Sequence, residues 1–211
     1  MSIHPTTSLS RVLHVPTGVD RFGFPTYGKL PAGVPNPPNA LTEGLELQIV
    51  RVRNAQTRSS PQAVKFTEYL AEHGGTDVWW EFARQYRANT SFLRGWAGTA
   101  MMGAAMGISA LQAQGAKSTY RRMRPHQVDP SIQQIGKTEK DASYPSGHTT
   151  AAFAAATVMS RLWPTRAQEF NWWANQVGMS RVAAGMHFPS DVRAGANLGT
   201  RVGLRMISTI N

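Results

Sequence analysis

The 211-residue chain contains no cysteine, and this absence excludes several kinds of site at once. Without thiols there is no disulfide framework, no thiolate zinc centre and no cysteine nucleophile. A chain of this length buries most of its apolar surface without cross-links, so we expect one globular domain.

Acidic side chains are scarce in this sequence. Twelve Asp and Glu stand against 22 Lys and Arg, which gives a formal net charge of +10. Of the basic residues 17 are arginines, whose planar guanidinium groups suit bidentate contact with phosphate or carboxylate. The composition therefore predicts an anionic partner.

Long apolar runs are nearly absent. The one long uncharged run, residues 95–116, could span a membrane by its length, but it contains five glycines and no second such run follows. We predict a buried, closely packed core helix here, with a membrane-associated helix as the alternative. The first 20 residues hold no apolar stretch of signal-peptide length, which favours a soluble, cytoplasmic protein, or a periplasmic or secreted one if the N-terminus has been processed.

Prolines are concentrated at the start of the chain, where seven of the 13 fall within the first 38 residues. Proline at this density prevents regular helices and central strands. We predict an extended arm over residues 1–40 and a folded domain over 41–211. The aromatic residues expected to anchor the arm, against its own domain or a neighbouring subunit of a homo-oligomer, are Phe22, Phe24 and Tyr27.

The rest of the chain carries helical periodicity, and no strand pattern competes with it. The predicted helical segments are a weak one from residue 41, then 61–73, 77–94, 95–116, a short basic one at 117–123, 147–162, 165–182 and 189–207. The fold class is therefore all-α, a compact bundle of about six or seven helices with the extended proline-rich arm.

Three segments concentrate residues that can do chemistry. In the first, Lys117, Arg121 and Arg124 are spaced by four and three positions and would share one helix face. Like charges on one face repel each other, and an anion between them would remove that repulsion. A solvated basic face is the alternative.

The second segment, residues 143–149, lies where a proline-containing loop enters an alanine-rich helix. Ser146 stands at the expected N-cap, Gly147 permits close approach of a ligand to the backbone, and His148 falls in the first turn. Free backbone N–H groups and the helix dipole would attract a phosphate here. An ordinary capped helix is the alternative.

The third segment contains Arg181, His187 and Asp191. If the last helix begins near Pro189, the Asp191 carboxylate can reach the imidazole of His187, fix its tautomer and leave its other nitrogen free as a nucleophile. Arg181 would supply another bidentate contact to an anion. A purely structural His/Asp pair is the alternative.

Together the three segments resemble a known signature: Lys, six residues, Arg-Pro; then Pro-Ser-Gly-His; then Ser-Arg, five residues, His, three residues, Asp. It is the signature of the superfamily of type-2 phosphatidic acid phosphatases, bacterial class A non-specific acid phosphatases and vanadium haloperoxidases. The resemblance covers residues 117–191. Chain length and the lack of repeated apolar runs make the soluble class A acid phosphatases the most similar branch.

The resemblance implies a role for each matching residue. His187 would be the nucleophile, Asp191 would orient it, and His148 would protonate the leaving oxygen and later activate water. The residues expected to bind the phosphoryl oxygens are Lys117, Arg124, Ser146, Gly147 and Arg181. His126 follows Arg124-Pro125, where an aromatic residue is usual, and is a candidate for the substrate pocket.

The sequence thus predicts a phosphatase that hydrolyses phosphomonoesters, or a related phosphate or pyrophosphate ester, through a phosphohistidine intermediate. No metal or other cofactor is expected, and vanadate should inhibit. One alternative is a haloperoxidase that uses vanadate as cofactor at the same anion site. A basic nucleic-acid or membrane-surface binding protein is the other, although no nucleic-acid motif accompanies the charge, so we expect a phosphorylated small molecule as partner, no nucleic acid, and at most peripheral membrane contact.

Overall fold

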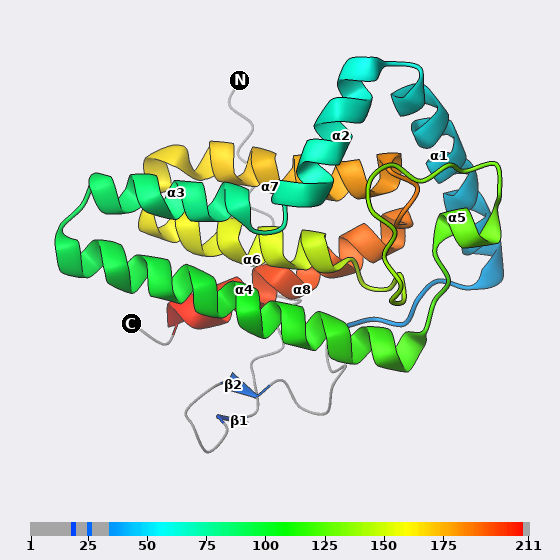
Figure 1. Ribbon diagram of the computed structural model, residues 1–211. Coiled ribbons are helices and arrows are strands. Elements are labelled where there is room, and N and C mark those ends of the chain that lie inside the picture. Colours follow the sequence, from blue (N-terminus) through cyan, green and yellow to red (C-terminus); the bar gives the residue numbers. More distant parts are fainter. Residues whose placement is uncertain (1–17, 20–24, 27–33, 209–211) are drawn as a thin grey trace, which may run out of the picture.

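The protein is a helical bundle, as predicted, in a computed structural model that describes residues 18–19, 25–26 and 34–208. Within these residues the long helices are α1 (Ala40–Arg58), α2 (Pro61–His73), α3 (Asp77–Ala88), α4 (Phe92–Tyr120), α6 (Gly147–Leu162), α7 (Ala167–Ala183) and α8 (Pro189–Ser208) (Figure 1). Two short elements lie between them, the four-residue helix α5 (Pro125–Val128) and the 3-10 turn η2 (Pro164–Arg166).

Most of the predicted arm lies outside the described residues, including Phe22, Phe24 and Tyr27. Two described pieces, β1 (Gly18–Val19) and β2 (Pro25–Thr26), pair as antiparallel strands of two residues each. Val34 is buried, and its carbonyl oxygen accepts a hydrogen bond of 3.1 Å from the Tyr120 hydroxyl. The chain is therefore fixed to the end of α4 before α1 begins.

Helix α6 lies in the middle of the bundle, and α4, α7 and α8 pack around it (Figure 1). Five of its alanines are buried, and α8 presents glycines at every fourth position: Gly195, Gly199 and Gly203. A Cβ atom at Gly195 would lie 2.6 Å from the carbonyl oxygen of Ser146, so only glycine fits. Because the backbones touch, the beginnings of α6 and α8 lie side by side, and the Ser146 N–H donates to the Asp191 carbonyl at 3.0 Å.

The aromatic part of the core lies between α3 and α7. Trp79 is fully buried, and its indole N–H donates to the Gly74 carbonyl at 2.9 Å. Phe82 meets Phe170 edge to face with ring centroids 5.0 Å apart. Trp80, the neighbour of Trp79, is 44% exposed, as expected of adjacent positions on a helix that is buried on one side.

Helix α1 turns polar side chains inward. Glu46 and Asn54 are buried, and the Asn54 amide donates to the carbonyl oxygens of Gln133 and Ala183 at 2.9 Å each. Its outward face carries exposed aliphatic residues: Leu41, Leu45, Ile49 and Val52. This helix thus binds neighbouring loops through hydrogen bonds on its inner face.

Several predicted boundaries were wrong. The separate basic helix at 117–123 does not exist, because α4 continues to Tyr120 and ends at Arg121, whose backbone is left-handed with φ 47°. The helix predicted over 77–94 stops at Ala88, and a new helix starts after Ser91. The core helix predicted over 95–116 is part of α4, which is buried along one side only. Among the described helices, none combines the length and the apolar character that a membrane span requires.

Candidate active site

The first turns of α6 and α8 form the floor of the candidate site. Ser146 is the N-cap of α6 by position, but its hydroxyl caps no helix N–H group and instead accepts a hydrogen bond of 2.9 Å from Thr149. A Cβ atom at Gly147 would meet no other atom within 4 Å. The amino end of α6 is therefore accessible to an anion at the position the sequence predicted.

His187 and Asp191 face each other at the start of α8. Both side chains are fully buried, and His187 Nδ1 lies 3.4 Å from Asp191 Oδ2. His187 Nε2 lies 3.1 Å from Nη1 of Arg124. A guanidinium can only donate, so Nε2 carries the lone pair and the proton of the neutral ring is on Nδ1, which lies near Asp191 but makes no hydrogen bond to a described residue.

The electrostatic surroundings keep the His187 ring neutral. Burial lowers its pKa well below the usual value, and the positive charges of Arg124, Arg181 and Lys117 act in the same direction. A buried, neutral imidazole with its lone pair on Nε2 is a competent nucleophile.

Burial raises the pKa of Asp191. Its Oδ2 atom accepts hydrogen bonds from the Ser143 hydroxyl at 2.5 Å and from the Phe188 N–H at 2.8 Å, and Oδ1 accepts from Arg122 at 2.6 Å. These donors favour the ionised carboxylate and oppose the effect of burial. The aspartate is thus held in one orientation beside the imidazole.

Three predicted cations are buried around His187. Lys117, Arg124 and Arg181 are 4%, 0% and 1% exposed and come from the end of α4, the coil after it and the last turn of α7. Lys117 pairs with Asp141 at 2.7 Å, and Arg124 pairs with the same carboxylate at 2.6 Å. In the described chain, Nε and Nη1 of Arg181 are buried without a hydrogen-bond partner. These two groups are donors that an anion could satisfy.

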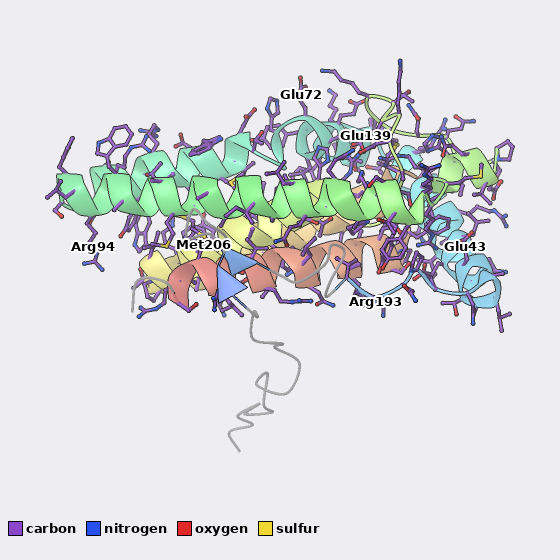
Figure 2. All side chains as sticks on the ribbon, turned by 90° about the horizontal axis from the view of Figure 1, so that it is seen from below. Glu43, Glu72, Arg94, Glu139, Arg193 and Met206 are labelled. Atoms are coloured by element: carbon purple, nitrogen blue, oxygen red, sulfur yellow. The ribbon has the colours of Figure 1, made fainter. Side chains whose placement is uncertain are left out.

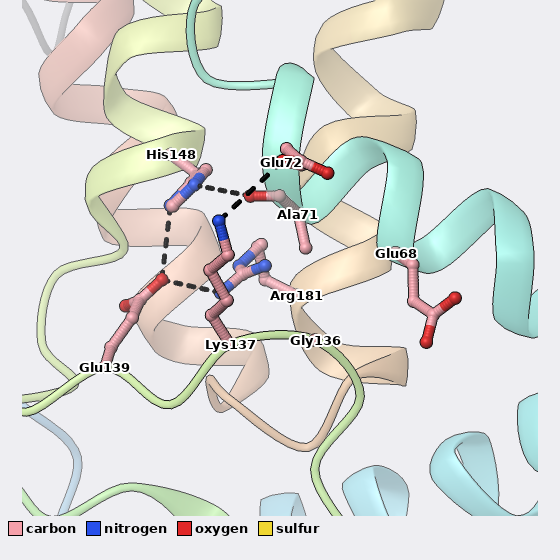
Figure 3. A pocket seen from close by; sticks show the side chains of 8 residues that line it. All are labelled: Glu68, Ala71, Glu72, Gly136, Lys137, Glu139, His148 and Arg181. Atoms are coloured by element: carbon pink, nitrogen blue, oxygen red, sulfur yellow. Dashed lines mark hydrogen bonds and ion pairs between the residues drawn. The ribbon is translucent and has the colours of Figure 1, made fainter.

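Glu139 is in contact with several of these groups, and Figure 3 shows it beside His148 and Arg181. Its carboxylate is 2.6 Å from Arg124 and 2.8 Å from Arg181. It also lies 3.5 Å from His148 Nδ1 and 3.9 Å from His187 Nε2. Burial alone would raise its pKa, but the positive charges of Arg181 and Arg124 outweigh burial and bring the pKa to about 2. A permanent negative charge therefore lies where the predicted anion-binding residues converge.

His148 lies beside Glu139 in the first turn of α6. Its Nε2 is 3.1 Å from the carbonyl oxygen of Ala71 in the last turn of α2. Since a carbonyl can only accept, Nε2 carries the proton and Nδ1 faces the centre of the site. Burial lowers the pKa of His148 to about 4, and Arg181 contributes in the same direction.

A cavity of about 620 Å³ opens beside Glu139, His148 and Arg181, whereas Lys117, Arg124 and His187 are not among its lining residues. Its lining residues are Glu68, Ala71, Glu72, Gly136, Lys137, Glu139, His148 and Arg181 (Figure 3). Helix α2 and the loop before α6 form its outer part, where Lys137 lies 3.7 Å from Glu72. The inner end reaches Arg181 and His148, so a bound molecule would contact both the charged centre and the α2 wall.

Two residues selected from the sequence lie elsewhere. Arg121 is exposed at the end of α4, and its Nε donates to the Ser118 carbonyl at 3.2 Å, so the predicted shared face with Lys117 and Arg124 is wrong. The left-handed turn at Arg121 separates these side chains. His126 is half-buried outside the 620 Å³ cavity, with Nδ1 3.2 Å from the Gly185 carbonyl oxygen.

Sequence reasoning missed three charged residues of this region: Arg122, Glu139 and Asp141. The two acids stand alone in a polar loop with no periodic pattern, and their partners are distant in sequence. The one available signal was their position just before the Ser143–His148 segment. The described residues contain no group of three or more His, Asp or Glu that could hold a metal ion.

Fold and site together define a helical protein with a buried cluster of cations and a His–Asp pair. The chain belongs to the PAP2 superfamily, which residues 98–211 match. Over 88 residues it is 40% identical to a non-specific acid phosphatase of Salmonella typhi, a match that covers 40% of this chain and 35% of that protein. Over 87 residues it is 37% identical to a decaprenylphosphoryl-5-phosphoribose phosphatase of Mycobacterium tuberculosis, covering 41% and 47%. The matched segment thus spans about a third to a half of these relatives.

Solved structures share the fold. A bacterial vanadium-dependent iodoperoxidase superposes with a TM-score of 0.72 at 18% identity, covering 84% of this chain and 53% of that one. A PAP2-type phosphatidylglycerolphosphate phosphatase from Bacillus subtilis has a TM-score of 0.64 at 20% identity, covering 82% and 87%. At these identities the likeness describes the fold alone.

Proposed function

We propose that the protein is a phosphatase that hydrolyses phosphomonoesters, or a related phosphate or pyrophosphate ester, through a phosphohistidine intermediate. The observation that carries this proposal is the burial of Lys117, Arg124 and Arg181 around His187, whose Nε2 lies 3.1 Å from Arg124. The names of the acid phosphatases that share 35–40% identity support the same reaction class.

Substrate binding would begin with an exchange of anions. The phosphoryl group replaces the Glu139 carboxylate between Arg124 and Arg181, and it gains the unpaired Arg181 N–H groups and the amino end of α6. A phosphate monoester carries nearly two negative charges above about pH 6, whereas a carboxylate carries one. The cations in this low-dielectric site then stabilise the charge of the in-line transition state.

In the first chemical step, His187 Nε2 attacks phosphorus, so that a P–N bond forms as the ester P–O bond breaks. The ring becomes positively charged, and Asp191 stabilises it through the Nδ1 proton. His148 donates the Nδ1 proton to the leaving oxygen. Because its pKa is about 4 in the ligand-free protein, the phosphate dianion must raise it, as a neighbouring negative charge does.

In the second step, neutral His148 accepts a proton from water as the water oxygen attacks phosphorus. The P–N bond breaks, His187 regains its lone pair and inorganic phosphate leaves. Arginine and lysine side chains supply the positive charge throughout, so the mechanism requires no metal ion.

The leaving group would occupy the outer part of the cavity. Glu68 and Glu72 on α2, and Lys137 on the loop, line this part. The phosphoryl contacts are made deeper, so these residues determine which alcohols fit.

The test is hydrolysis of p-nitrophenyl phosphate between pH 4 and 8 in the presence of a chelator, with and without orthovanadate. We expect chelator-resistant turnover that vanadate inhibits and that His187→Ala abolishes. Turnover that persists in His187→Ala would contradict the mechanism.

Vanadate-dependent halide oxidation is the second candidate, favoured by the fold of the iodoperoxidase. The same cations and His187 would hold vanadate, which would activate peroxide. Bromide oxidation by protein loaded with vanadate and supplied with peroxide would support this candidate, and its absence would leave phosphoester hydrolysis.

A further inference from the structure

Arg122 is a buried arginine that lies behind the His187–Asp191 pair. It follows the end of α4 and is 8% exposed, and it does not line the 620 Å³ cavity. Its Nη1 atom donates to Asp191 Oδ1 at 2.6 Å. Arg124, two residues later, contacts His187 instead. Each member of the His187–Asp191 pair is therefore contacted by a different arginine.

The rest of the Arg122 guanidinium is also held. Nη1 donates to the Ser190 hydroxyl at 2.8 Å, Nε donates to Glu43 at 2.9 Å, and Nη2 lies 3.4 Å from Glu46. The guanidinium carbon lies 3.9 Å from the centre of the Phe188 ring. Every edge of the side chain is fixed, so its position relative to Asp191 is defined by α1 and α8 together.

Among the described residues that contact Asp191, Arg122 is the one with a permanent positive charge. Asp191 faces Arg122 from the coil after α4, Ser143 and the phenol of Tyr144 from the loop before α6, and His187 from its own turn. Beyond Arg122 lie the carboxylates of Glu43 and Glu46, and Arg193 lies 3.6 Å from Glu46. If Arg122 were uncharged, Asp191 would be buried among acids, and a buried carboxylate without a cation takes up a proton.

We propose that Arg122 is a positioning residue that keeps Asp191 ionised and aimed at His187 Nδ1, and thereby stabilises the positively charged ring of the intermediate. The proposal rests on the proposed function for its catalytic consequence. The charge state of Asp191, the other part of the proposal, can be measured whether or not the protein is active.

The catalytic test compares Arg122→Met and Arg122→Lys with the wild type. We expect Arg122→Met to lower kcat at least about tenfold and to move the acidic limb of the kcat/KM profile up by about one pH unit. The vanadate inhibition constant should change less than about threefold, because Arg122 contacts Asp191, Glu43 and Glu46 and none of the residues proposed to bind the phosphoryl oxygens. Arg122→Lys restores a positive charge, so it should reverse most of the shift of the acidic limb that Arg122→Met causes.

The matched control is Glu43→Gln, which removes an Arg122 partner that does not touch Asp191. It should leave the acidic limb unchanged. Loss of Arg122 leaves Glu46 with Ser190 and Arg193 as its partners. The double variant Arg122→Met/Glu46→Gln therefore carries one buried acid fewer and serves if the single variant does not fold.

The activity-independent test is a carbon-13 NMR titration of the Asp191 carboxyl carbon, assigned with Asp191→Asn. We expect its midpoint to rise by at least about one pH unit in Arg122→Met. Equal midpoints in the two proteins would overturn the proposal, as would a loss of kcat with no movement of the acidic limb. A wild type without phosphatase activity would refute the proposed function, while this titration would still decide the role of Arg122.

Discussion

Glu139 and Arg181 form an ion pair of 2.8 Å at the inner end of the cavity, and the arginine side chain is 2% exposed. In the proposed mechanism, the pair occupies the position that the phosphoryl group would take. An oxyanion that binds at this position must displace Glu139, a residue of the loop before α6, and this displacement costs free energy. The apparent affinity for phosphate is lowered by the fraction of molecules in which Glu139 holds this position.

Glu139→Gln should tighten the binding of inorganic phosphate by about tenfold or more, because an amide competes poorly for two buried guanidinium groups. The measurement is calorimetric titration at pH 7. Sulfate should gain by a similar factor, since the competing side chain is the same for both anions.

Glu68→Gln is the control for this experiment. Glu68 lines the same cavity, is exposed, and its substitution makes the same change in charge. Its phosphate affinity should stay within about twofold of wild type, since exposed charges interact weakly through water. Equal affinities in Glu139→Gln and wild type would show that Glu139 does not compete.

His148→Gln should separate the two chemical steps. With p-nitrophenyl phosphate the leaving group departs as an anion, so His187 can be phosphorylated without His148, while water attack loses its base. We expect a burst of about one nitrophenolate per protein molecule, followed by slow turnover. Rapid-quench measurement detects the burst, which His187→Ala should lack. Steady turnover of His148→Gln at the wild-type rate would assign the base to another group.

The stability of the protein should fall as the pH is lowered through the range that His148 defines. Its pKa is about 4 in the folded protein against 6.5 in the reference state, so between these values the unfolded chain binds a proton and the folded chain does not. The contribution is complete above pH 6.5 and is lost towards pH 4, an effect of roughly 1–3 kcal/mol. His148→Gln should flatten the decrease of Tm over this range. Identical slopes for the two proteins would contradict the lowered pKa.

The glycines of α8 should not tolerate a methyl group. A Cβ atom at Gly199 would overlap the Thr150 carbonyl oxygen and lie 2.9 Å from the Ala154 nitrogen, so Gly199→Ala should cost about 2–3 kcal/mol or more. Gly44→Ala is the control, because a Cβ there meets nothing within 4 Å and alanine favours the exposed helix by roughly 0.5–1 kcal/mol. Thermal unfolding should show Tm changes of opposite sign.

The starts of α6 and α8 could be predicted because their signals are local. Gly147 follows a proline-containing loop and an N-cap serine, and Pro189 opens the last helix, so both boundaries agree with the structure. These two boundaries already place His148, His187 and Asp191 at helix beginnings. The other predicted site residues followed from the spacing of the motif.

Other features depend on tertiary contacts that the sequence does not display. Whether residues 117–123 continue the preceding helix or start a new one depends on the turn at Arg121, which no proline or glycine marks. The placement of Glu139 against Arg124 and Arg181 depends on how a polar loop folds back over two helix ends. Nothing local in the sequence distinguishes Arg122 from the neighbouring basic residues, and only its burial among acids places it beside Asp191.

The close contact of α6 with α8 separates catalytic geometry from substrate choice. His148 and His187 stand at the beginnings of two helices whose backbones touch, so their spacing depends on residues such as Gly195 and Gly199. The outer wall of the cavity comes from α2 and the loop that carries Lys137 and Glu139, which lie along the upper side of the molecule in Figure 2. If the proposed function holds, substitutions in that wall alter which alcohol is accepted while the distance between His148 and His187 is preserved, and libraries for new substrates belong there.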